Sequence, residues 1–199
     1  MAAARLAGRG IPAAADPRQS RGLRDEAKRE ENTAPNVLAT MVTTTSFGTW
    51  LPGDARGYVE DGVILAGDPR VLERSRSLLS KEPVFFDEAQ CDALFDALCA
   101  AASAFHYVLT DAAIESWHLH WIVRHGYDRV PTMVGRLKTR MRQALDSGRV
   151  WTEGYCHTCL YSEEALQGRR DYIARHPGCR MTNGRIIRPS SSRWVDRRR

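Results

Sequence analysis

Two histidines separated by a single residue form the feature of this sequence with the clearest chemical potential. They lie in the segment Trp117-His118-Leu119-His120-Trp121. Side chains alternate between the two faces of a β-strand, so His118 and His120 would point the same way and could hold one divalent cation. Such a cation can polarise a phosphate oxygen. The same spacing also occurs in pairs of surface histidines on a half-exposed strand, and spacing alone leaves both interpretations open.

A tyrosine and a histidine four residues apart form a second candidate pair. In Tyr172-Ile173-Ala174-Arg175-His176 the first and last side chains would share one helix face. Tyr172 could attack phosphorus while His176 completes the ligands of the metal. A phenol, with a pKa of about 10, is a weak nucleophile at neutral pH, and a nearby metal would stabilise charge on the phosphoryl oxygens. The alternative is a packed tyrosine and a histidine favoured by the helix dipole.

Cysteine spacing offers a competing use for His176. Cys156 and Cys159 form a Cys-x-x-Cys pair, and His176 and Cys179 follow 17 and 20 residues after Cys159. This set could hold a tetrahedral structural zinc ion. Since the chain has five cysteines, an odd number, and lacks the apolar stretch of a secretory signal, a disulfide framework is not expected.

The elements that would position these residues are visible in the apolar pattern. Asp87 and Gln90 resemble a capping box before a helix over 88–104, and Ser162 would cap a helix that Pro177 ends. We further predict a helix over 131–145, an irregular segment over 59–85, and strands over 36–46, 106–114, 117–124 and 149–161. This order favours an α+β fold, an antiparallel sheet with helices packed on one face.

Charge and composition divide the chain into three parts. The net charge is +5 and the pI about 9.1, but residues 1–35 carry +2, residues 180–199 carry +6 and the middle carries −3. We predict a disordered N-terminal extension (1–35), a folded domain (36–179) and a basic, flexible tail (180–199). No apolar run is long enough to span a membrane, so a cytoplasmic protein is expected.

One helix face concentrates positive charge within the predicted domain. The outer side of the helix over 131–145 carries four basic residues, Arg136, Lys138, Arg140 and Arg142. Lysine and arginine side chains neutralise phosphates, so this face is the expected contact for a DNA backbone. An ordinary solvated helix face would show the same pattern.

The two candidate pairs together resemble the HUH single-tyrosine transposases, which include the REP-associated tyrosine transposases. That family places His-hydrophobe-His on a central strand and Tyr-x-x-x-Gln or Tyr-x-x-x-Asn on a late helix. The matching residues here are His118-Leu119-His120 and Tyr172-x-x-x-His176. Thr49-Trp50-Leu51-Pro52-Gly53-Asp54-Ala55-Arg56-Gly57 and Trp151-x-x-Gly154-Tyr155 are also similar to stretches of the family, and the resemblance covers roughly residues 37–177.

The resemblance implies a DNA transposase that nicks and transfers single strands. It implies a ferredoxin-like sheet, a homodimer, Mg or Mn as the metal, and single-stranded DNA folded into hairpins as the partner. Tyr172 would form a covalent 5′-phosphotyrosine and leave a free 3′-hydroxyl, while His118, His120 and His176 would bind the metal. Two alternatives are a DNA-hairpin binder that no longer cuts and a small zinc-binding module.

The sequence departs from the family's pattern at two places. Glu115-Ser116 replaces the Pro-Asn that usually precedes the histidine pair, and His176 stands where the family has an amide. Because imidazole favours softer cations than an amide oxygen does, the second change shifts the expected preference from Mg toward Mn, Co or Zn.

Overall fold

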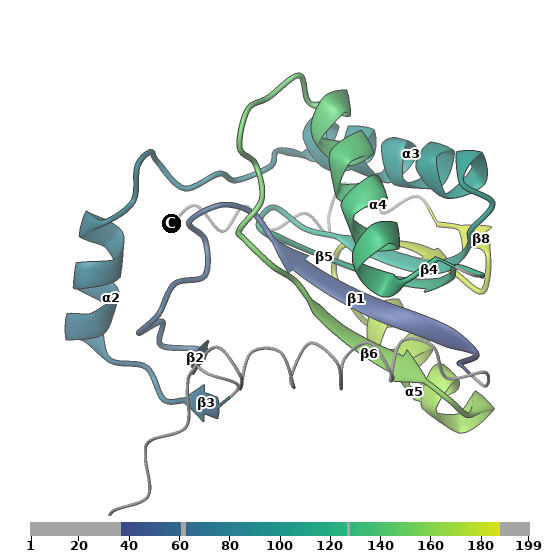
Figure 1. The fold of residues 1–199 in the computed structure, drawn as a ribbon, viewed down its shortest axis with the longest axis horizontal. Coiled ribbons are helices and arrows are strands. Elements are labelled where there is room, and N and C mark those ends of the chain that lie inside the picture. The colour runs from purple at the N-terminus through teal and green to yellow at the C-terminus, as the bar shows by residue number, and fades with distance from the viewer. Residues whose placement is uncertain (1–36, 61–62, 127, 188–199) are drawn as a thin grey trace, which may run out of the picture. The chain divides into compact units, whose positions relative to one another are not determined.

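The computed structural model describes residues 37–60, 63–126 and 128–187, and its centre is a six-stranded antiparallel sheet (Figure 1). The spatial order of its strands is β6-β1-β5-β4-β7-β8. The strands are β1 (Ala39–Thr45), β4 (Val108–Ile114), β5 (His118–Arg124), β6 (Cys156–Leu160), β7 (Cys179–Thr182) and β8 (Arg185–Ile186). The predicted α+β class and antiparallel sheet are confirmed.

Four of these strands and two helices form the ferredoxin-like part of the fold. Helix α3 (Glu88–Ala104) follows β1, and α4 (Val130–Ala144) follows β5, which gives the chain order β1-α3-β4-β5-α4-β6. The large apolar side chains of both helices pack with alternate strand residues, including Val42, Leu119 and Trp121. This is the ferredoxin-like β-α-β-β-α-β unit, with α3 and α4 on one face of the sheet.

A third helix covers the opposite face. In α5 (Glu163–Ala174) two buried residues, Leu166 and Ile173, pack with the strand residues that lie between those of the first core, including Met41 and Ile122. The expected helical layer on one face therefore describes α3 and α4, and α5 adds a second layer (Figure 1). A buried carboxylate also holds α5, because Arg170 Nε lies 3.4 Å from Asp111 Oδ2.

Helices α3 and α5 begin where their polar caps predict. The Asp87 carboxylate accepts from the backbone N–H of Gln90 at 2.8 Å, and the Gln90 side chain accepts from that of Asp87 at 3.0 Å. Ser162 Oγ accepts from the N–H of Ala165 at 3.1 Å at the start of α5. Each bond satisfies a backbone donor that the first helical turn leaves unpaired.

The segment expected to be irregular contains short elements. Helix α2 (Pro69–Ser77) lies there, and β2 (Tyr58–Glu60) pairs with β3 (Val63–Leu65) in a small separate sheet.

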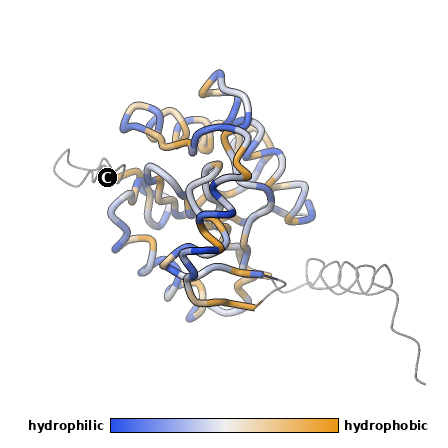
Figure 2. Tube along the Cα trace, turned by 90° about the vertical axis from the view of Figure 1, so that its left-hand side faces the viewer, coloured by the Kyte–Doolittle hydropathy of each residue, from blue (hydrophilic) through white to orange (hydrophobic). Residues whose placement is uncertain are grey.

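Hydrophobic and hydrophilic residues interleave along the trace (Figure 2). Within the described ranges, no helix has the length and apolar character that crossing a bilayer requires.

The C-terminal boundary needs a correction. Residues 180–187, expected in a flexible tail, extend the sheet, because β7 pairs with β4 and β8 pairs with β7. Arg180 is 3% exposed, and its Nη2 lies 3.1 Å from Asp92 Oδ1, so an ion pair offsets part of the cost of burying this charge. The folded domain therefore continues past residue 179 to the last described residues. The predicted extension over 1–35 lies outside the described residues.

Candidate active site

Three histidines meet on the sheet face that α5 covers. His118 and His120 project from β5 with ring centroids 4.8 Å apart, and the ring of His176 lies 4.9 and 5.0 Å from theirs. One ligand nitrogen from each lies within 4.8 Å of the others, so the cluster could hold a metal ion. In the part of the chain that the structure describes, no other group of three histidine, cysteine or acidic residues has such an arrangement.

The spacing of the nitrogens matches what a cation requires. Nε2 of His118 and Nε2 of His176 lie 2.9 Å apart, a distance at which the two rings share one proton. Two nitrogens bonded to one tetrahedral zinc ion, each at about 2.0–2.1 Å, lie about 3.3 Å apart, which is close to the observed separation. The lone pairs that share a proton could therefore bind one cation instead.

Oxygen atoms lie against the outer nitrogens of all three rings. Glu115, in the turn before β5, places its carboxylate 3.6 Å from Nδ1 of His118 and 3.3 Å from Nδ1 of His176. The Oγ1 of Thr43, which faces His120 in the β1–β5 register, is hydrogen-bonded to Nδ1 of His120 at 2.8 Å. A ring whose Nδ1–H donates outward turns its Nε2 lone pair toward the cluster. The donor set therefore fits a metal.

The environment of the cluster keeps one ligand neutral. Burial, and to a smaller extent the positive charge of a protonated His176, lower the pKa of His120 to about 3. A neutral imidazole is the form that binds a metal. Three imidazole nitrogens suit transition metals better than they suit Mg, which prefers oxygen ligands.

Tyr172 lies beside the cluster in the last turn of α5. Its Oη is 3.3 Å from Nε2 of His120, and 41% of the residue is exposed, so an external molecule can reach it. His176 lies just beyond the end of α5, where its backbone N–H still bonds to the carbonyl of Ile173 at 3.0 Å. The predicted proximity of Tyr172 and His176 is thus observed, with ring centroids 6.0 Å apart.

The basic side chains of α4 are not brought to this site. The helix packs on the other sheet face, and Arg136 pairs with Asp128 there. Lys138 donates to the carbonyls of Thr152 and Gly154, and burial lowers its pKa to about 8. The other two members, Arg140 and Arg142, contact Gln143 and the carbonyl of Ser147. DNA contact by this face stays a prediction.

Strand order excludes the zinc site proposed for the cysteines. Cys156 and Cys159 lie on β6, whereas Cys179 begins β7, and β1, β5 and β4 lie between these strands. At about 4.8 Å per strand, the two pairs are separated by roughly 19 Å. Zinc–sulfur bonds of about 2.3 Å cannot span that separation, so the interpretation as a cysteine-based zinc module is wrong.

Two residues of the site escape a search of the sequence. Thr43 belongs to a threonine run in β1, and only the strand register shows which of these threonines faces His120. Glu115 stands out in the sequence only because it differs from the Pro-Asn of the transposases that the sequence resembles. In the structure the Glu115 carboxylate contacts His176, so the two positions at which the sequence differs from those transposases lie side by side.

No protein-family model and no curated protein matches the chain. A solved structure of a REP-associated tyrosine transposase bound to a REP hairpin is 13% identical with a TM-score of 0.44, over 68% of this chain and 63% of that one. A structure of a Deinococcus radiodurans R1 protein assigned as a transposase is 15% identical with a TM-score of 0.38, over 70% and 91%. The chain thus spans less than two thirds of the first, and likenesses this distant establish neither its family nor its function.

Proposed function

We propose that this protein is a metal-dependent DNA strand transferase of the single-tyrosine transposase type, acting on single-stranded DNA. The observation that carries the proposal is the position of the hydroxyl of Tyr172, a residue that is 41% exposed, 3.3 Å from a nitrogen of the three-histidine cluster. A nucleophile and a cation site that meet at the surface suit an attack on a phosphodiester. The homodimer and the hairpin substrate that the resemblance implies stay predictions.

The assigned roles follow from the geometry. A bound divalent cation would polarise a phosphate oxygen and stabilise the charge that develops on it. His118, His120 and His176 would hold the cation through Nε2, and Glu115 and Thr43 would orient the rings. Because Tyr172 is exposed, its phenolic proton can leave to solvent.

The strand transfer then conserves the number of phosphodiester bonds. Tyr172 Oη attacks phosphorus, the bond from phosphorus to the 3′-oxygen breaks, and that oxygen takes up a proton. The 5′-phosphate stays bonded to Tyr172. Attack by a 3′-hydroxyl on this phosphotyrosine releases Tyr172 and joins two strands.

A covalent protein–DNA adduct is the direct test. The full chain is incubated with the single-stranded DNA ends that flank its own gene, with Mg or Mn, and the adduct is resolved on a denaturing gel. We expect an adduct from the parent protein and none from Tyr172→Phe, because this change removes only the attacking oxygen and keeps the ring. Tyr161→Phe is the matched control, since Tyr161 is 47% exposed and precedes the same helix.

The outcomes separate the possible functions. An undiminished adduct in Tyr172→Phe would move the nucleophile to another tyrosine. A parent protein that binds DNA but forms no adduct with any divalent metal would favour the binder that no longer cuts. In that case the strand-transferase proposal is wrong.

A further inference from the structure

An exposed stack of aromatic and guanidinium groups extends from the histidine cluster. The Trp117 ring lies between the His118 ring, 3.8 Å away by centroids, and the Arg56 guanidinium, whose Cζ is 4.3 Å from the Trp117 centroid. The Trp50 ring meets Trp117 edge-on at 6.1 Å and lies 5.5 Å from the same Cζ. Trp50 is 37% exposed and the Arg56 side chain 43%. The Trp50 ring and the Arg56 guanidinium therefore present π surface to solvent beside the candidate metal site.

The loop that carries Trp50 and Arg56 has a defined conformation. The backbone N–H of Ser46 donates to the Trp117 carbonyl at 2.9 Å, and Thr49 Oγ1 donates to the Ser46 carbonyl at 2.8 Å. The Trp50 indole N–H donates to the Gly57 carbonyl at 2.7 Å. Gly53 has a φ of +86°, and a Cβ there would collide with the backbone of Asp68 and Leu72. The loop is thus fastened both to the turn before β5 and to the start of α2, so the exposed rings are held in place.

The contacts of Arg56 indicate which chemistry the surface can recognise. Its Nε and Nη2 donate to the two carboxylate oxygens of Asp54 at 2.7 and 2.6 Å, and Nη2 also donates to the Thr49 carbonyl. Asp54 therefore offsets the charge and occupies one of the two guanidinium edges that can bind a phosphate. The flat, polarisable face of the group suits stacking on another planar π system.

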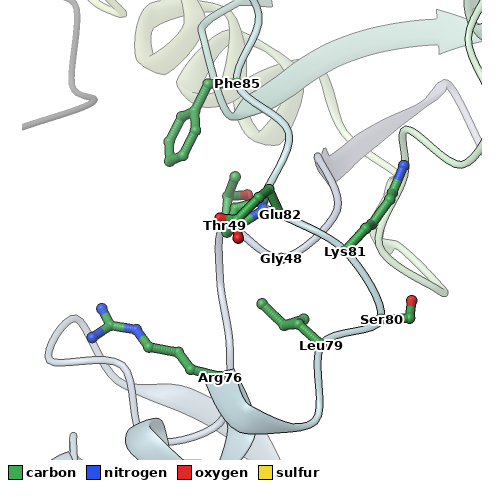
Figure 3. A pocket seen from close by; sticks show the side chains of 9 residues that line it. Gly48, Thr49, Arg76, Leu79, Ser80, Lys81, Glu82 and Phe85 are labelled. Carbon is green, nitrogen blue, oxygen red and sulfur yellow. The ribbon is translucent and has the colours of Figure 1, made fainter.

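A pocket next to the same loop provides room for a ligand. It has a volume of about 710 Å³, and Thr49 forms part of its wall. Arg76 and Lys81 lie at opposite sides of it (Figure 3). Pockets of about 300–1,000 Å³ accommodate small organic ligands, so a nucleotide is of suitable size.

We propose that Trp50, Arg56 and Trp117 form a stacking surface for an unpaired base of single-stranded DNA. The base would lie next to the histidine cluster, where the scissile phosphate would bind. The choice of single-stranded DNA as the ligand rests on the proposed function. Aromatic side chains bind unpaired bases without sequence preference, because every base has a π face. The surface would hold a nucleotide that flanks the scissile phosphate and so position the strand for Tyr172.

The test compares DNA with and without bases. Binding of the full chain to a fluorescein-labelled oligothymidylate, and to an abasic strand of equal length, is measured by fluorescence anisotropy. In the parent protein we expect removal of the bases to weaken binding, and Trp50→Ala to weaken oligothymidylate binding by about 5- to 150-fold, the range for loss of one stacked base. Trp50→Ala should bind the abasic strand as the parent does, and Trp50→Phe should recover most of the loss. The matched control is Ile64→Ala, another exposed apolar side chain.

Each result supports or overturns the stacking surface. Equal affinity of the parent and Trp50→Ala for oligothymidylate overturns it, and so does an equal loss on both strands, which would place the contact on the backbone. The abasic comparison in the parent needs no variant, so misfolding of Trp50→Ala leaves a valid test. The two proposals fail in different ways. A parent protein that forms no adduct refutes strand transfer but leaves the effect of the bases measurable, whereas a parent protein that forms the adduct and binds both strands equally refutes only the stacking surface.

Discussion

The two faces of the central sheet differ in what the same strands contribute to them. On β5, Leu119 and Trp121 point into the core with α3 and α4, whereas His118 and His120 point toward α5. Strand alternation therefore lets one segment supply packing on one side and candidate metal ligands on the other. The buried apolar residues hold the strand in place, so the geometry of the histidines depends on the opposite face.

The helices on the two faces are anchored unequally. Helix α4 buries five residues, whereas α5 buries Leu166 and Ile173 and is further held by the Arg170–Asp111 ion pair. The weaker anchoring leaves the last turn of α5 open, which is where Tyr172 meets solvent. Stability and chemistry are thus largely assigned to different faces, and substitutions on each face can test this division.

The largest effect is an expected difference in stability between variants of Leu119 and His120, neighbours on β5 that point to opposite faces. Leu119→Ala should lower the free energy of unfolding by about 2–5 kcal/mol, because it removes buried methyl groups and leaves a cavity. His120→Ala should lower it by about 1 kcal/mol, since that residue borders the open site. Denaturant unfolding of both variants without metal measures the difference. Equal losses would show that the histidine face carries as much of the stability as the core.

Much of this division could be predicted from the sequence. The alternation in Trp117-His118-Leu119-His120-Trp121 places the histidines on one face, and the spacing of Tyr172 and His176 brings them together even though α5 ends at Ala174. The short strands β7 and β8 were missed because they lie in an arginine-rich segment. The ion pair of Arg180 with Asp92 depends on contacts that no local pattern encodes.

A smaller effect, on metal affinity, is expected from Glu115, whose carboxylate lies beside Nδ1 of two of the histidine rings. Glu115→Gln keeps the size of the side chain but removes the charge beside Nδ1 of His118 and His176. Loss of such an outer partner typically weakens metal affinity by 10- to 100-fold, or about 1.4–2.7 kcal/mol. Isothermal titration of the full chain with Mn or Zn salts measures it.

Two further variants sharpen the Glu115 result. Glu153→Gln removes an exposed carboxylate and should leave the affinity unchanged, whereas His118→Ala removes a proposed ligand and should lose more affinity than Glu115→Gln. If Glu115→Gln binds the metal as tightly as the parent, Glu115 serves only the turn before β5. The sequence could not predict this role, because it requires the turn to return the carboxylate to the histidine face.

The smallest effect, on the salt dependence of DNA binding, is expected from the basic side chains of α4. The sequence alone predicts these side chains as the DNA contact. Arg136 and Arg140 lie on the sheet face opposite the histidines, and Arg136 is already paired with Asp128. A strand bound at the histidine cluster would reach them only by passing round the edge of the sheet. We therefore expect the double substitution Arg136→Gln and Arg140→Gln to leave the salt dependence of single-strand binding nearly unchanged. Each phosphate contact contributes about 0.7 to the slope of log affinity against log salt, so a decrease of about 1.4 in its magnitude would show that both arginines contact phosphates and that the DNA path includes α4.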